Sequence, residues 1–96
     1  MTKIALLGAG GKMGVRLATN LKGSRFEVDH VELSAAGRNR LKDEAGLDCV
    51  DMSVALRGAD IVVLAVPDRL IGEVTKSIID HLRPGAAVIE IGRAHV

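Results

Sequence analysis

The chain has 96 residues, with 13 Lys and Arg against 12 Asp and Glu, and its formal net charge of +1 favours neither a nucleic acid nor an anionic membrane as partner. Its apolar runs are far shorter than the roughly 20 residues that a membrane helix needs, and the N-terminus lacks the apolar stretch of a signal peptide. One Phe, with no Trp or Tyr, excludes an aromatic platform for single-stranded nucleic acid. We therefore expect a soluble, cytoplasmic protein with one domain over residues 1–96.

The first third of the chain predicts a strand, a helix and a second strand. The apolar run 3–7 ends in glycine, which is typical of a strand covered on both faces. Apolar residues then recur at a spacing of four over 11–21, which predicts an amphipathic helix closed by Lys22 and Gly23. Apolar and polar residues alternate over 26–33, which predicts a second strand nearer a sheet edge.

The rest of the chain predicts further helices and strands in alternation. Ser34 is placed to cap a helix that ends near Glu44, before Gly46. A weak third strand, a short helical segment, a strong fourth strand, a helix and a fifth strand are predicted, in that order, over 47–50, 52–56, 60–66, 69–82 and 86–91.

This alternation predicts the fold class. Strands that alternate with helices of this length indicate an α/β, Rossmann-type, doubly wound parallel sheet of about five strands in the order 3-2-1-4-5, with helices on both faces. The sequence stops just after the fifth strand, where a substrate-binding part would follow. We therefore expect a cofactor domain cut from a longer protein.

The strongest functional signal is the glycine-rich turn after the first strand. A pyrophosphate is bound by backbone N–H groups at a helix start, where glycines allow a close approach. The third glycine of the usual G-x-G-x-x-G pattern comes one residue late, at Gly14. The context nevertheless fits, because a strand precedes the turn, a helix follows it, and the acidic Glu32 ends the second strand. The turn residues predicted to bind a dinucleotide are Gly8, Ala9, Gly10, Gly11, Lys12 and Met13.

Two other interpretations of the turn are a packing role alone and the phosphate-binding loop of an NTPase. The glycines could serve only to tighten strand–helix packing. A phosphate-binding loop of an NTPase requires Ser or Thr after Gly-Lys and a glycine five residues before that pair, whereas Met13 and Leu6 occupy these positions. The NTPase interpretation is therefore rejected.

Three segments, 8–14, 64–68 and 83–85, resemble motifs of the 6-phosphogluconate and β-hydroxyacid dehydrogenase superfamily. Within it the chain looks most like the group of small-sugar-acid oxidoreductases that includes D-apionate oxidoisomerase. The resemblance implies that a largely helical second domain, absent here, binds the substrate, completes the active site and forms a homodimer. It also implies that the loop after the fourth strand contacts the cofactor through Ala65, Val66, Pro67 and Asp68. The tail 92–96 departs from the relatives' pattern, which leaves its role open.

The resemblance implies hydride transfer between a nicotinamide cofactor and a small hydroxy acid or sugar acid, with the catalytic group supplied from beyond this chain. Two alternatives remain. The glycine turn also resembles that of dihydrodipicolinate reductase, although that family does not continue with an Ala-Val-Pro-Asp loop. A non-catalytic module that senses NAD and NADH would need the same cofactor site.

The choice between NAD and NADP depends on residues after the second strand. Glu32 can accept the adenosine ribose hydroxyls and would repel a 2'-phosphate, so it favours NAD. Arg38 and Arg40 could instead bind a 2'-phosphate, or could be ordinary solvated helix surface. We expect NAD, with NADP the less favoured cofactor.

Other polar residues have simpler expected roles. Asp68 is expected to cap the helix that follows Pro67, and the Met13 side chain to pack in the core. Glu90, within the last strand, is expected at an exposed face. No histidine has a partner at metal-ligand spacing, so we expect no metal.

Overall fold

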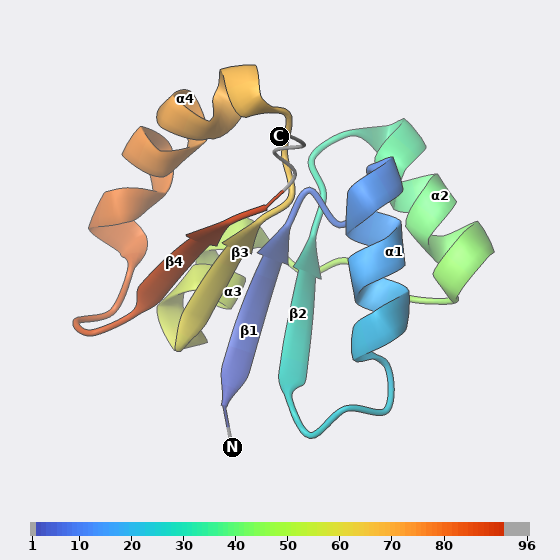
Figure 1. The fold of residues 1–96 in the computed structure, drawn as a ribbon, viewed down its shortest axis with the longest axis horizontal. Helices are drawn as coiled ribbons and strands as arrows, with labels where there is room; N and C mark the ends of the chain where they lie inside the picture. The colour runs from blue at the N-terminus through green and yellow to red at the C-terminus, as the bar shows by residue number, and fades with distance from the viewer. Residues whose placement is uncertain (1, 92–96) are drawn as a thin grey trace.

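The computed structural model describes residues 2–91, in which four parallel strands form one sheet between two layers of helices (Figure 1). The sheet has the order β2-β1-β3-β4. The elements, in chain order, are β1 (Lys3–Leu7), α1 (Lys12–Leu21), β2 (Glu27–Val31), α2 (Ala35–Ala45), α3 (Met52–Gly58), β3 (Ile61–Leu64), α4 (Asp68–Ile78), the 3-10 helix η1 (Ile79–His81) and β4 (Ala87–Glu90).

The strands end at the same level of the sheet. Leu7, the last residue of β1, is in register with Val31 of β2 on one side and with Leu64 of β3 on the other. The chain leaves β1 toward β2 and later returns to the opposite side of β1 as β3 (Figure 1). The loops after these three strands therefore meet at one edge, at the point where a ligand cleft is expected in a doubly wound sheet.

The fold class is confirmed, with one strand fewer than expected among the described residues. The observed order is the expected one without its third strand, and β2 lies at the sheet edge as its alternating sequence predicted. The prediction of a strand over 47–50 is wrong. This segment is an irregular connection that donates a hydrogen bond of 2.8 Å from Val50 N to the carbonyl oxygen of His30. A single hydrogen bond of this kind does not form the repeated bonding pattern of paired β-strands.

Two apolar clusters cover the two faces of the sheet. On one face, α1 and α2 pack on β1 and β3 through residues that include Val15, Leu41 and Leu6. On the other face, α3, α4 and η1 are held by a cluster that includes Leu56, Leu64 and Ile78. The expectation of helices on both faces is confirmed (Figure 1).

The helix ends of α2 follow the expected capping chemistry. Ser34 is the N-cap, and its Oγ accepts a hydrogen bond of 2.9 Å from Gly37 N. Gly46 ends the helix in the left-handed conformation, with φ of 69°, which glycine adopts without strain. Ser34 therefore marks where α2 begins, and Gly46 marks where it ends.

Close contact between α1 and β1 requires Gly14. A Cβ at this position would collide with the carbonyl oxygen of Gly8 and would lie 2.8 Å from the carbonyl carbon of Ala9. The absence of a side chain lets α1 start directly against the end of β1. The late third glycine thus has the packing role that the sequence pattern predicts.

No helix in the described part of the chain is long and apolar enough to cross a membrane.

Candidate functional site

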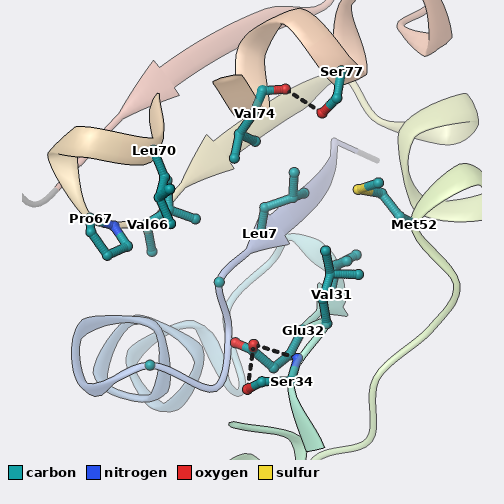
Figure 2. Close-up of a pocket in the computed structure, with 14 residues that line it drawn as sticks. Leu7, Val31, Glu32, Ser34, Met52, Val66, Pro67, Leu70, Val74 and Ser77 are labelled. Carbon is teal, nitrogen blue, oxygen red and sulfur yellow. Dashed lines mark hydrogen bonds between the residues drawn. The ribbon is translucent and has the colours of Figure 1, made fainter. Parts of the chain in front are cut away.

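A cleft of about 370 Å³ opens at the carboxyl ends of β1, β2 and β3 (Figure 2). Its volume is in the range of small-ligand sites. Most of its wall is apolar, and its polar groups are concentrated on the side of the glycine turn. The lining residues are Leu7, Gly8, Gly11, Val31, Glu32, Leu33, Ser34, Met52, Ala65, Val66, Pro67, Leu70, Val74 and Ser77.

The backbone of the glycine turn is bonded to the chain itself. The N–H groups of Gly8 and Ala9 both donate to the carbonyl oxygen of Val31, at 2.9 and 3.1 Å. The N–H of Gly11 donates to the carbonyl oxygen of Gly8, at 3.1 Å. The N–H of Gly10 donates to a side chain, Glu32 Oε1, at 2.9 Å. All four N–H groups from Gly8 to Gly11 are therefore bonded within the chain.

The donors left for an anion belong to the first turn of α1. Its N-cap is Gly11, with no side-chain capping bond and no acidic residue in the first turn. The first N–H groups of a helix have no acceptor within the helix, and the helix dipole adds positive potential there. The N–H groups of Lys12, Met13 and Gly14 are thus available to an anion, and Gly11, the residue just before them, lines the cleft.

Glycine is required at Gly8 and Gly10 for different contacts. Gly8 has φ of 80°, and a Cβ there would collide with the carbonyl oxygen of Ala65, in the loop after β3. A Cβ on Gly10 would collide with the backbone of Gly37, in α2. The sequence pattern indicates close approach at Gly10 to a phosphate, whereas the structure shows close approach to α2.

Glu32 lies just after β2, with its side chain directed to the turn (Figure 2). Besides the bond from Gly10 N to Oε1, its Oε2 accepts hydrogen bonds of 3.0 Å from Ser34 N and from Ser34 Oγ. Four neutral or backbone donors would be needed to saturate an ionised carboxylate, and three are present. The side chain is held in one place with acceptor capacity remaining.

The two arginines after Glu32 bind backbone carbonyl groups. Arg40 is half-buried, and its Nη1 donates a hydrogen bond of 2.6 Å to the carbonyl oxygen of Gly10. Arg38 is exposed, and its Nη1 donates to the carbonyl oxygens of Glu32 and Leu33, at 3.1 and 2.8 Å. The interpretation of Arg40 as ordinary solvated surface is therefore wrong.

The loop after β3 forms the opposite wall of the cleft. Ala65, Val66 and Pro67 all line it, and Figure 2 shows Val66 and Pro67. Asp68 is the first residue of α4, and Pro67 holds the N-cap position without a side-chain capping bond. The expectation that Asp68 is the cap is wrong because the helix begins one residue earlier than the pattern indicates. At this position its negative charge still favours the helix dipole.

Five of the predicted cofactor residues, Ala9, Gly10, Lys12, Met13 and Asp68, lie beside the cleft and do not line it. Ala9 is fully buried in the core beneath the turn, and Gly10 faces α2. Lys12 and Met13 lie at the exposed start of α1, where Met13 is 38% exposed. The expectation that Met13 packs in the core is wrong, because the buried face of α1 is formed by Gly14, Val15 and Ala18.

Several residues that complete the cleft were not identified from the sequence. Leu70, Val74 and Ser77 share one side of α4, at spacings of four and three that place them on one helix face. Their period predicts the helix but not which side faces a ligand. Met52, at the start of α3, reaches the cleft only through the fold (Figure 2).

Neither the Cys49 thiol nor a cluster of metal-ligating side chains provides a reactive group among the described residues. Burial raises the pKa of the Cys49 thiol above its ordinary value, and the nearby charge of Glu32 raises it further. The thiol is thus held in its unreactive protonated form at neutral pH. Over residues 2–91 there is no group of three or more His, Cys, Asp or Glu side chains that could hold a metal. Glu90 lies exposed on β4, as expected, and the tail 92–96 is outside the described residues.

Known proteins with this arrangement identify the family. Residues 3–96 match the family described as the NAD-binding domain of 6-phosphogluconate dehydrogenase. This chain belongs to that family. The match extends over β1 to β4 and includes the loop after β3, which favours this family over the dihydrodipicolinate reductases.

Individual members of the family are closely similar. D-apionate oxidoisomerase of Rhizobium rhizogenes is 58% identical over 98% of this chain, and that of Cupriavidus necator is 55% identical over 96%. The crystal structure of a semialdehyde dehydrogenase NAD-binding protein from Cupriavidus necator, in complex with calcium and NAD, superposes with a TM-score of 0.91 at 55% identity over 95% of this chain. The chain spans about a third of the length of these relatives, 33 to 34%.

Proposed function

We propose that this NAD-binding domain serves an oxidoreductase that transfers a hydride between NAD and a carbon of a small hydroxy acid or sugar acid. The observation that carries the proposal is the cleft at the strand ends, which joins the uncapped start of α1, a fixed carboxylate at Glu32 and an apolar wall in one continuous surface. These are the three surfaces that a dinucleotide needs.

Each part of the cleft suits one part of the cofactor. The N–H groups of Lys12, Met13 and Gly14 would hold the pyrophosphate at the helix N-terminus. Glu32 would accept the adenosine ribose hydroxyls. Apolar side chains that include Met52, Leu70 and Val74 offer a dry surface for a flat base. Ala65, Val66 and Pro67 would lie along the remaining ribose and nicotinamide. Ala9, buried under the turn, and Asp68, the first residue of α4, would support this arrangement without lining the cleft.

Glu32 supports NAD over NADP. The Glu32 carboxylate could move away from a 2'-phosphate only if its hydrogen bonds from Gly10 and Ser34 broke, and the like charges would repel each other. Arg40 and Arg38 each donate from Nη1 to backbone carbonyl groups, so a 2'-phosphate would compete with these bonds for the same donors.

When bound, the cofactor supplies the hydride acceptor or donor. This chain binds and orients it, and the group that exchanges the substrate proton would come from outside residues 2–91. D-apionate oxidoisomerases carry about two thirds of their length beyond the matching region, which is where a substrate-binding and dimer-forming part would lie.

Cofactor binding is tested by titration of the chain with NADH, followed by nicotinamide fluorescence. We expect saturable binding that Gly10→Ala weakens by at least tenfold, because a Cβ there pushes the turn away from α2. Gly72→Ala is the matched control, since a Cβ at Gly72 meets nothing within 4 Å. Absence of a saturable response in the wild-type chain would overturn the proposal.

The reaction is tested with a chimera in which this chain replaces the matching third of the Rhizobium rhizogenes enzyme. We expect NADH to form when small sugar acids or hydroxy acids are added with NAD. A chimera that binds NADH yet shows no turnover, while the parent enzyme is active in the same assay, would contradict the proposed reaction.

A further inference from the structure

Arg40 holds the peptide between Gly10 and Gly11, in the middle of the glycine turn, from the side of α2. The peptide between Gly10 and Gly11 is flanked by two residues without Cβ atoms, so its orientation is poorly restricted by local sterics. The Arg40 guanidinium, which is half-buried, donates a hydrogen bond of 2.6 Å to the oxygen of this peptide. A charged donor makes a stronger bond than a neutral one. One orientation is thereby selected, in which Gly11 N–H is bonded to Gly8 and α1 starts at Lys12.

Gly37, one turn before Arg40 on α2, controls the other side of Gly10. A Cβ on Gly37 would lie 2.5 Å from Glu32 Cδ and 2.6 Å from Glu32 Cγ, so the Glu32 side chain lies directly against the backbone of α2. Gly37 is buried, and its N–H donates to Ser34 Oγ, which in turn donates to Glu32 Oε2. The missing side chain at Gly37 is what allows Glu32 to reach Gly10 N–H.

We propose that Arg40 and Gly37 are positioning residues of the cofactor site, Arg40 for the pyrophosphate-binding start of α1 and Gly37 for the ribose-binding carboxylate of Glu32. The two residues lie three positions apart on one face of α2 and act on the carbonyl and the N–H side of Gly10, respectively. This inference deepens the proposed function and rests on it.

The two roles are separated by ligands that contain different parts of the cofactor. Binding of NADH, NADPH, ADP-ribose and adenosine is measured for Arg40→Met, Arg40→Lys, Gly37→Ala and the control Arg57→Met, whose side chain is exposed on α3. We expect Arg40→Met to weaken the binding of NADH and of ADP-ribose about tenfold, because one charged hydrogen bond to the turn is lost. The binding of adenosine, which has no pyrophosphate, should weaken less than twofold. Arg40→Lys should recover most of the affinity, since an ammonium also donates to a carbonyl oxygen.

Gly37→Ala tests the second role. The three atoms nearest to the added methyl group belong to the side chains of Glu32 and Ser34 and none is a backbone atom, so the chain should still fold while the Glu32 carboxylate is displaced from its hydrogen bonds. We expect NADH binding to weaken about tenfold and NADPH binding to change less than twofold, which reduces the preference for NADH.

The amide resonances of Gly10 and Gly11 in the ligand-free chain provide a readout that does not depend on binding. Both should shift in Arg40→Met and return toward their wild-type positions in Arg40→Lys, with no change in Arg57→Met. The inference is overturned if these resonances do not move, or if Arg40→Met weakens the binding of adenosine and of ADP-ribose equally. A wild-type chain that binds no NADH overturns the proposed function instead, whatever the resonances show.

Discussion

Glu32 connects three parts of the site through one carboxylate. It accepts hydrogen bonds from Gly10 in the turn and from Ser34 before α2, and it lines the cleft. Its importance could be predicted from the sequence, because an acidic residue at the end of the second strand is recognisable by its distance from the turn. Its bond from Gly10 could not be predicted, since Gly10 is 22 positions away in the chain.

Substitution of Glu32 should change the choice of cofactor. We expect Glu32→Gln to retain an acceptor for Gly10 N–H while the charge that repels a 2'-phosphate is lost, so NADPH binding should improve by about tenfold relative to NADH. Glu32→Ala should also lose the preference and in addition leave the Gly10 N–H without its acceptor. Binding of both cofactors to each variant, measured by nicotinamide fluorescence, checks this. An unchanged ratio for Glu32→Gln would show that the carboxylate does not select NAD.

The role of Arg40 could not be predicted from the sequence pattern. Its sequence position fits an exposed helix surface or a 2'-phosphate site equally well. The bond to Gly10, which is 30 positions away, exists only because α2 packs against the glycine turn.

Helices and strands were well predicted where several residues share a period. The apolar stripe of α1 and the capping residues of α2 placed both helices to within about two residues. The predicted strand over 47–50 failed because four residues carry too little pattern to distinguish a strand from a connection along a sheet edge. Asp68 failed as a cap for a similar reason, since a shift of one residue changes its role.

The junction of α1 with β1 should be intolerant of any side chain at Gly14. We expect Gly14→Ala to lower the free energy of unfolding by about 1–3 kcal/mol, because the methyl group would meet the backbone of Gly8 and Ala9 and these atoms cannot move aside without shifting the helix. Urea denaturation measures this difference.

Gly72→Ala is the control for the same exchange in another helix. Gly72 lies within α4 with no neighbour near its missing Cβ, so alanine should raise the free energy of unfolding by up to about 1 kcal/mol through helix propensity. Equal effects of the two substitutions would mean that the contact at Gly14 is not tight.

The stability of the whole molecule should depend on pH through His30. This residue is 9% exposed in β2, and burial lowers the pKa of its imidazole below the ordinary value of about 6.5, against a smaller opposite effect of Asp29. The unfolded chain therefore binds a proton more readily than the folded chain. The contribution of His30 to the free energy of unfolding is complete above the pKa of the imidazole in the unfolded chain. It is lost as the pH falls from about 7 toward the lower pKa of the imidazole in the folded chain.

His30→Gln removes this dependence. We expect the free energy of unfolding of the variant to change less than that of the wild type between about pH 7 and pH 5.5, as measured by urea denaturation at each pH. At lower pH both proteins should lose stability through Asp60, whose pKa is held below its ordinary value first by the Lys3 N–H bond and then by Arg83. Parallel curves for the two proteins above pH 5.5 would contradict the assignment to His30.

Apart from the strand wrongly predicted over 47–50, the sequence by itself determined the alternation of strands and helices, the parallel sheet, the glycine turn and the acidic residue at the end of the second strand. Each of these depends on neighbours in the chain or on a short period. Only the tertiary structure decided how α2 reaches the turn, which face of α4 and which end of α3 line the cleft, and that the N–H groups of Gly8 to Gly11 are bonded internally. The physical reason is that these contacts join residues far apart in the chain, and their geometry is set by the packing of two helical layers on one sheet.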